Sequence, residues 1–73
     1  MIEIILDCYD AKVYGRETRL QVHAKRIKNG IRFEIWDLDY KEIIATFRVN
    51  IPDLEEFLKI VKALITEMEV EKK

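Results

Sequence analysis

Cysteine, histidine and proline each occur once among the 73 residues of this sequence, and glycine occurs twice. A single cysteine, Cys8, excludes a disulfide within the chain. One cysteine and one histidine cannot supply the four ligands of a structural zinc site, so we predict no bound metal and no cofactor. Because a domain this small gains only a few kcal/mol from its core, we expect the chain to form a homodimer.

Enzymatic motifs are also missing. The chain has no glycine-rich phosphate loop, no nucleophile motif and no second histidine to assist Cys8. Asp37 and Asp39 adjoin a predicted turn and could hold a hard cation, but turn acids are more often solvated or accept hydrogen bonds from backbone N–H groups. We therefore predict a protein that is not an enzyme and has no catalytic residue.

Long apolar runs and a signal-peptide pattern are absent as well. The first residues lack a basic region and a small-residue cleavage site. No apolar stretch approaches the roughly 20 residues that a membrane helix requires. We expect a cytoplasmic protein without a membrane partner.

Charge is nearly balanced in total but unevenly distributed. The formal net charge is −1. From Lys12 to Trp36 there are seven lysines and arginines against two glutamates, whereas the residues from Ile51 onward hold six acids against four lysines. Charge that is concentrated in one region matters more for binding than the total, so the first half of the chain is the place to look for an anion-binding surface.

The pattern of apolar residues predicts one α+β domain over residues 1–73. Apolar and polar residues alternate in four segments, as in half-buried strands, and a helical repeat follows. We predict a four-stranded antiparallel β-meander followed by one C-terminal α-helix packed on one face (ββββα). The predicted strands are about 1–9, 18–28, 31–38 and 42–49, and the predicted helix is about 53–70.

The predicted helix has a start signal and an apolar stripe. Pro52 cannot donate within a ladder, and Asp53 with Glu56 forms a capping-box pattern. The apolar residues that follow recur at helical spacing, and we expect them to be core, packed on the inner face of the sheet. They are Leu54, Phe57, Leu58, Val61, Leu64, Ile65 and Met68, with Ile60 at the edge of the stripe.

Asn29-Gly30 lies between two alternating segments and predicts a hairpin. Both central residues of a type I′ turn need positive φ, which asparagine and glycine tolerate. With these two residues as the turn, His23 lies opposite Trp36 and Lys25 lies opposite Glu34. The hairpin therefore predicts a specific register for the two central strands.

The next connection, residues 39–41, leads into the fourth strand. Keeping the apolar residues of that strand on the core face predicts Trp36 opposite Ile44 and Arg32 opposite Arg48. Two like charges directly opposite each other destabilise a sheet. Their presence favours an anionic ligand on that face.

The polar face of the predicted sheet combines cations with a tryptophan. Single-stranded nucleic acid is bound by cations that follow the phosphates and by flat side chains on which bases stack. We predict non-catalytic binding of single-stranded DNA or RNA on this exposed face, with Trp36 as the stacking platform. The predicted binding residues are Arg19, His23, Lys25, Arg32, Trp36 and Arg48.

An alternative interpretation uses the same residues. Tryptophan and arginine are also enriched in protein interfaces. The protein is then a small interaction module whose open polar face docks on a protein partner or on a second copy. The basic residues then form only a solvent-exposed rim around the interface, which keeps the protein soluble.

Two short segments carry a resemblance to a known family. Phe33-Glu34-Ile35-Trp36 and Ile51-Pro52-Asp53-Leu54-Glu55-Glu56-Phe57 are similar to the aromatic-bearing strand and the helix start of single-stranded-DNA-binding transcriptional coactivators of the positive cofactor four type. That family and its small prokaryotic relatives are ββββα proteins known as dimers. The resemblance covers roughly the last 45 residues and implies binding of single-stranded DNA through the sheet, at positions Lys25, Arg32, Trp36 and Arg48.

Overall fold

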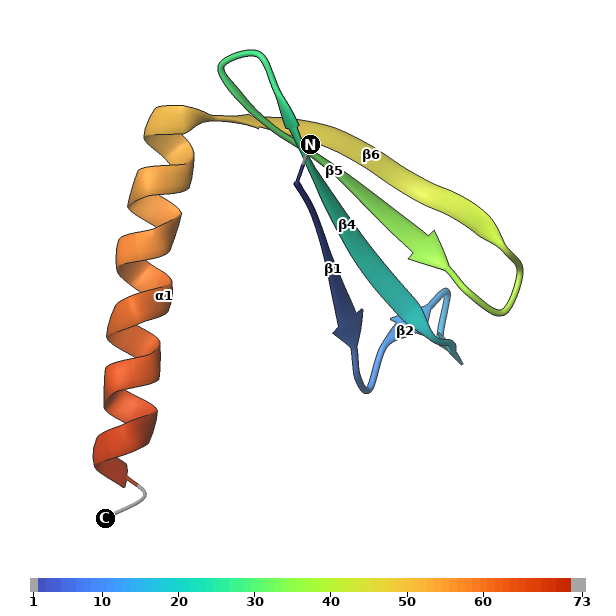
Figure 1. The fold of residues 1–73 in the computed structure, drawn as a ribbon. Coiled ribbons are helices and arrows are strands. Elements are labelled where there is room, and N and C mark those ends of the chain that lie inside the picture. The colour runs from blue at the N-terminus through green and yellow to red at the C-terminus, as the bar shows by residue number, and fades with distance from the viewer. Residues whose placement is uncertain (1, 72–73) are drawn as a thin grey trace.

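The computed structural model describes residues 2–71 and has the predicted α+β arrangement, a four-stranded antiparallel sheet followed by one C-terminal helix (Figure 1). Met1, the first residue of the predicted strand 1–9, lies outside the described residues. The elements are β1 (Glu3–Cys8), β2 (Lys12–Val13), β3 (Arg16–Glu17), β4 (Leu20–Ile27), β5 (Gly30–Asp37), β6 (Glu42–Asn50) and α1 (Ile51–Glu71).

The large sheet has the strand order β1-β4-β5-β6, with every neighbouring pair antiparallel. A small hairpin, β2-β3, interrupts the connection between β1 and β4. Its two turn residues, Tyr14 and Gly15, both have positive φ, at 52° and 75°. The two positive φ angles that a type I′ turn requires are therefore found in this hairpin, within a segment where the alternation predicts no strand.

The β4–β5 turn corrects the predicted position of the hairpin. Lys28 and Asn29 form the turn, and Ile27 pairs with Gly30. Of the turn residues only Asn29 has positive φ, at 64°, so the type I′ prediction at Asn29-Gly30 is wrong. Gly30 is instead the first residue of β5. Glycine is required at this position because the backbone of Val49 in β6 approaches too closely for a side chain.

The register between β4 and β5 differs from the prediction by two residues. His23 pairs with Glu34 rather than Trp36, and Lys25 pairs with Arg32 rather than Glu34. Side chains alternate across a strand with a period of two. A shift of two residues therefore leaves every side chain on its predicted face.

The register between β5 and β6 follows the prediction along most of its length. Arg32 lies opposite Arg48, as predicted. Near the connecting loop an irregularity between Ile35 and Trp36 places Trp36 opposite Ile43, so the predicted pairing with Ile44 is wrong. A bulge of this kind opposes two residues on one strand to one on the other, which alternation alone does not reveal.

Gly30→Ala is expected to lower the free energy of unfolding by about 1–3 kcal/mol, because an added methyl group in a tightly packed place forces backbone shifts. A Cβ atom at Gly30 would collide with the Val49 carbonyl oxygen, and its distance to the Val49 carbonyl carbon would be 3.3 Å. Urea unfolding followed by circular dichroism measures the effect. Lys28→Ala, in the exposed turn beside it, is the control and should change stability little; equal stability of both variants would contradict the prediction.

Helix α1 begins at Ile51, immediately after the last residue of β6. Asn50 therefore precedes the helix, and asparagine is a favoured residue at that position. Asp53 lies within the first turn and does not cap it, so the helix starts two residues before the predicted start at 53. Within the described chain, no helix is both long enough and apolar enough to span a bilayer.

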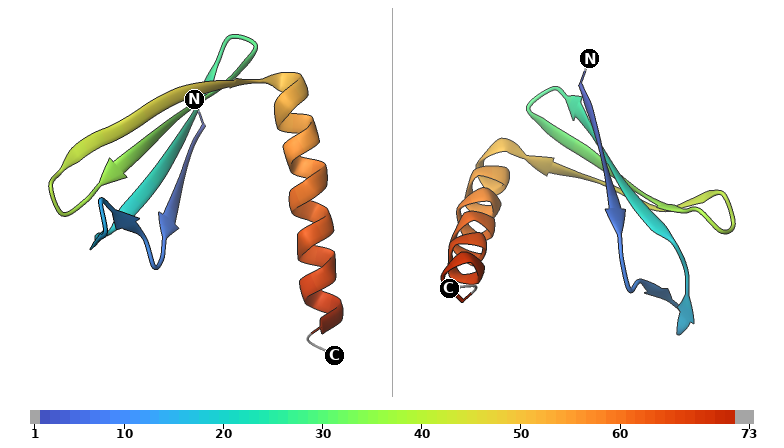
Figure 2. Two further views of the ribbon diagram at one scale, coloured as in Figure 1. Left: turned by 180° about the vertical axis from the view of Figure 1, so that it is seen from behind. Right: turned by 60° about the horizontal axis from the view of Figure 1, so that its bottom comes forward.

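The apolar stripe of α1 is not the core that its spacing predicts. Over Ile51–Glu71 no residue is buried, and of the stripe only Leu54 and Val61 are partly covered. Figures 1 and 2 show α1 standing apart from the sheet in every view. No loop residue separates β6 from α1, and the Ile51 N–H donates to the Asn29 carbonyl at 3.3 Å, which holds the start of the helix at the β4–β5 turn.

The apolar face of the sheet is correspondingly open. We give this name to Ile4, Leu6, Val22, Ala24, Phe33, Ile35, Ala45 and Phe47, which the registers place on one side. Phe33 and Phe47 stack across the strands, with 5.3 Å between ring centroids. Among residues 2–71, Ala24 is the one buried apolar residue. The isolated chain thus has a sheet and a helix but almost no core.

Candidate nucleic-acid interface

The opposite side of the sheet is the polar face, and its side chains form three rows across the strands. One row is Glu3, Lys25, Arg32 and Arg48; the next is Ile5, His23, Glu34 and Thr46; the third is Asp7, Gln21, Trp36 and Ile43. Five of the six predicted binding residues belong to these rows. The structure therefore brings together His23, Lys25, Arg32, Trp36 and Arg48 on one surface.

Three cations lie next to one another in the first row. Neighbouring strands are about 4.8 Å apart, so Arg32 is flanked by Lys25 on β4 and by Arg48 on β6. Both arginines are exposed. Among the ion pairs and hydrogen bonds formed by residues 2–71, none involves the guanidinium group of Arg32 or Arg48. Their mutual repulsion is therefore not neutralised by a carboxylate.

Glu34 neutralises the third cation and orients the tryptophan. Lys25 Nζ lies 3.2 Å from Glu34 Oε1, and the indole N–H of Trp36 donates to the same oxygen at 3.4 Å. The hydrogen bond from Lys25 is the main cause that lowers the pKa of Glu34 below its ordinary value of 4.5. The ion pair runs diagonally between strands, since Lys25 is opposite Arg32.

Trp36 is partly exposed and held in place by His23. Their ring centroids are 5.3 Å apart, and the ring planes meet at 34°. His23 in turn lies between two acceptors, with Nδ1 3.2 Å from Glu3 Oε1 and Nε2 3.0 Å from Gln21 Oε1. His23 and Glu34 thus orient the indole, which still presents part of its surface to solvent.

Arg19 is the predicted binding residue that the structure separates from the others. It precedes β4, and its Nε lies 2.9 Å from Asp39 Oδ1. Its backbone N–H donates to Asp39 Oδ2 at 3.0 Å. Arg19 therefore has a carboxylate partner at the end of the sheet and is a weaker candidate for phosphate binding than Arg32 or Arg48.

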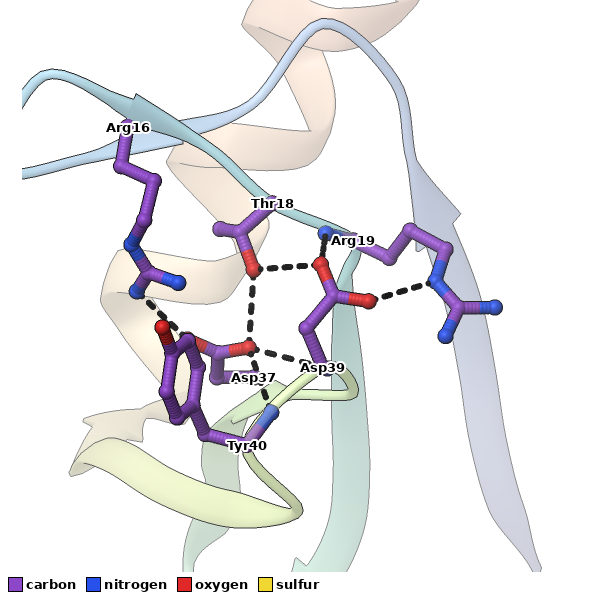
Figure 3. A network of polar contacts seen from close by, with 6 residues as sticks. All are labelled: Arg16, Thr18, Arg19, Asp37, Asp39 and Tyr40. Carbon is purple, nitrogen blue, oxygen red and sulfur yellow. Dashed lines mark hydrogen bonds and ion pairs between the residues drawn. The ribbon is translucent and has the colours of Figure 1, made fainter.

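A polar network at that end of the sheet was not predicted as a unit (Figure 3). Asp37, the last residue of β5, is 1% exposed. Its Oδ1 accepts the Thr18 hydroxyl at 2.8 Å and the backbone N–H groups of Asp39 and Tyr40 at 3.0 and 3.2 Å. Arg16 Nη2 lies 3.4 Å from Asp37 Oδ2. Of the two expected alternatives, solvation or acceptance of backbone N–H groups, both acids show the second.

Both acids of this network are held in the charged form. Burial alone would raise the pKa of Asp37, but the hydrogen bonds from Thr18, Tyr40 and Asp39 and the charge of Arg16 outweigh it and lower the pKa. Hydrogen bonds from the backbone and side chain of Arg19 lower the pKa of Asp39. In the part of the chain that the structure describes, no three acids, histidines or cysteines are grouped so as to hold a metal ion. The network links Asp37 and the turn after β5 to Thr18 and Arg16, and we call it the polar clamp.

The chain was compared with protein-family models, curated proteins and solved structures. No match was found. The resemblance to coactivators of the positive cofactor four type, carried by residues 33–36 and 51–57, therefore stays a prediction. What the chain offers for a functional proposal is the geometry of its polar face.

Proposed function

We propose that this protein binds single-stranded nucleic acid, without catalysis, through the polar face of its sheet. The observation that carries the proposal is the exposed pair Arg32 and Arg48, which lie directly opposite each other on β5 and β6. Two like charges in that position destabilise the sheet, and a phosphate bound between them offsets the repulsion. Lys25 extends the pair into a row of three cations.

Trp36 supplies the second element of a single-strand site. It lies four residues beyond Arg32 on β5, on the same face, which corresponds to about 13 Å along a strand. A short oligonucleotide that runs along β5 can therefore place a phosphate at the arginine pair and a base on the indole. Stacking on an aromatic side chain does not depend on the identity of the base, so we expect little sequence preference.

Glu34 lies between the row of three cations and Trp36, and it narrows the space available to a bound oligonucleotide. Its carboxylate is charged and repels phosphates, but it also draws Lys25 away from the row. The exposed guanidinium groups on β5 and β6 are therefore the stronger phosphate sites. The family resemblance favours DNA over RNA, and a cytoplasmic location is part of the same proposal.

Fluorescence anisotropy of a labelled oligothymidine, titrated with the protein at low and at moderate salt, tests the proposal. We expect affinity that falls steeply with salt, because phosphate contacts release counterions. Trp36→Ala should weaken binding by about 10-fold or more, as expected for the loss of one base stack, and Trp36→Phe should retain much of the affinity. Circular dichroism of each variant is the control for folding.

Absence of binding at low salt would contradict the proposal, because nonspecific electrostatic attraction is strongest there. It would favour the alternative function, in which the same face docks on a protein partner. Binding that does not change in Trp36→Ala would likewise remove the indole from the site.

A further inference from the structure

Two apolar surfaces of this chain are uncovered. One is the apolar face of the sheet, where Leu6 is 56% and Phe47 is 46% exposed. The other is the helix stripe defined above from Leu54 to Met68, where Phe57 is 62% exposed. Arg26 and Ile31, at one end of the apolar side of the sheet, line a common hollow with Leu54 of α1. Large exposed apolar patches of this kind mark interaction sites.

The accessible surface of the chain is larger than that of a compact monomer, as expected for one subunit of a dimer. The accessible surface is 6501 Å², whereas a compact monomer of 8.8 kDa exposes about 4,800 Å². The excess of about 1,700 Å² is more than the roughly 800 Å² that each partner loses in an interface of standard size. The radius of gyration, 14.6 Å, also exceeds the value of about 11 Å expected for a compact chain of this length.

The chain's own helix cannot cover the sheet. Because no residue separates β6 from α1, the helix has no loop with which to turn back over the strands, and the Ile51–Asn29 hydrogen bond holds its start. The width of the sheet also prevents a single helix from covering it. The outer strands of a four-stranded sheet are three spacings of about 4.8 Å apart, or about 14 Å, which exceeds the roughly 10 Å diameter of a helix. The chain's own helix would therefore leave part of the apolar face uncovered even if it packed there.

We propose that a second copy of this chain covers this face, with the α1 helix of each copy lying on the apolar face of the other copy. Each chain carries both surfaces, a helix stripe and a sheet face, so a two-fold exchange covers both in both copies and leaves no open end. A partner of different sequence is not required by this complementarity. The polar face lies on the other side of each sheet and remains free.

The distribution of charge favours an antiparallel arrangement of the two helices. The last turn of α1, which ends at Glu71, contains Glu69 and Glu71 and no basic residue. Acids at a helix C-terminus interact unfavourably with the helix dipole. Arg26 and Lys28 lie at the opposite end of the molecule from this turn, beside the start of α1. An antiparallel second helix brings its acidic end to these cations, which offsets the repulsion.

Sedimentation velocity over a range of protein concentrations tests the proposal. We expect the wild-type protein to be a dimer at micromolar concentration. Phe57→Glu should raise the dissociation constant by at least about 100-fold, since it places a charge in the centre of an apolar interface. Lys59→Glu, about 200° away around the helix, is the matched control and should remain a dimer. A monomeric wild-type protein, or open-ended oligomers, would overturn the proposal.

A mixing experiment separates exchange between copies from closure within one chain. Phe57→Lys alters the helix stripe, and Phe47→Glu alters the apolar face; each variant alone should be monomeric. An equimolar mixture should form heterodimers, because one helix–sheet contact is then wild-type and the other places lysine beside glutamate. A mixture that stays monomeric while both variants keep their circular dichroism spectrum would overturn the exchange. Both experiments are done without oligothymidine, so their outcome does not depend on whether the protein binds nucleic acid.

Discussion

Reversing both exposed arginines, in the double variant Arg32→Glu with Arg48→Glu, is expected to weaken oligothymidine binding by at least about 100-fold at low salt. The two guanidinium groups lie opposite each other on β5 and β6 and have no carboxylate partner among residues 2–71. Each contributes one phosphate contact to the proposed site, and each glutamate replaces that contact by repulsion. A 100-fold change corresponds to about 2.7 kcal/mol.

The salt dependence gives a second measure of the same change. The slope of log K against log salt concentration is about −0.7 for each phosphate neutralised on a single strand. Loss of two contacts should therefore make the slope less negative by about 1.4. This change in slope distinguishes lost phosphate contacts from a general loss of folded protein, which would lower the amount that binds without altering the slope.

Lys59→Glu with Lys62→Glu, on the exposed surface of α1, is the matched control. It changes the net charge by the same amount as the arginine double variant. If binding depends on the arginine pair, the control should stay within a few-fold of wild type. An equal loss in both double variants would show that only net charge matters, and the polar face would no longer be the proposed site.

Asp37→Ala is expected to cause the largest loss of stability of any single substitution in the clamp. The carboxylate is 1% exposed and accepts the Thr18 hydroxyl and two backbone N–H groups at one oxygen. Removing it leaves these donors without their acceptor in a place that water reaches poorly. We expect the Tm to fall by about 10 °C or more in a domain of this size, measured by circular dichroism.

Asp7→Ala is the control for this substitution. Asp7 is exposed and accepts a single hydrogen bond, from Gln21 at 2.9 Å. Its loss should shift the Tm by only a degree or two, because exposed polar contacts contribute little. A similar shift in both variants would mean that the Asp37 network does not hold the end of the sheet.

The same network predicts how stability depends on pH. The folded pKa values of Asp37 and Asp39 lie below the ordinary value of 3.8, so the folded state binds fewer protons than the unfolded state in this range. Their contribution to stability is therefore complete above about pH 5 and is lost as the pH falls through 3.8 and below. Urea unfolding between pH 3 and pH 7 should show this loss in the wild type and a weaker one in Asp37→Ala.

Alternation along the strands was enough to predict which residues share a face, except at Ile43, which the irregularity beside Trp36 moves from the predicted core face to the polar face. Trp36, Arg32 and Arg48 lie together on the polar face, as the sequence predicts. This result survived an error of two residues in the β4–β5 register, because the period of a strand is two and an even shift changes no side. The chemistry of the candidate site therefore depends on a property that is local to each strand.

The exact pairings depended on contacts between strands. Asn29-Gly30 is a strong turn signal, yet the turn falls on Lys28 and Asn29. Gly30 is needed within β5, where the Val49 carbonyl of the next strand leaves no room for a Cβ atom. A requirement set by β6, distant in sequence, thus decided the position of a turn between β4 and β5.

The polar clamp and the helix position show the same division. The acids at 37 and 39 were recognisable as turn residues, but only the folded chain places Thr18 and Arg16 against Asp37. The apolar period of α1 correctly predicts a helix, although not what the helix packs against. By itself, the sequence determined the four strands of the large sheet, the helix and most of their faces, since propensity and periodicity act within a few residues. Tertiary structure decided register, clamp and open apolar surfaces, since these depend on contacts between distant segments.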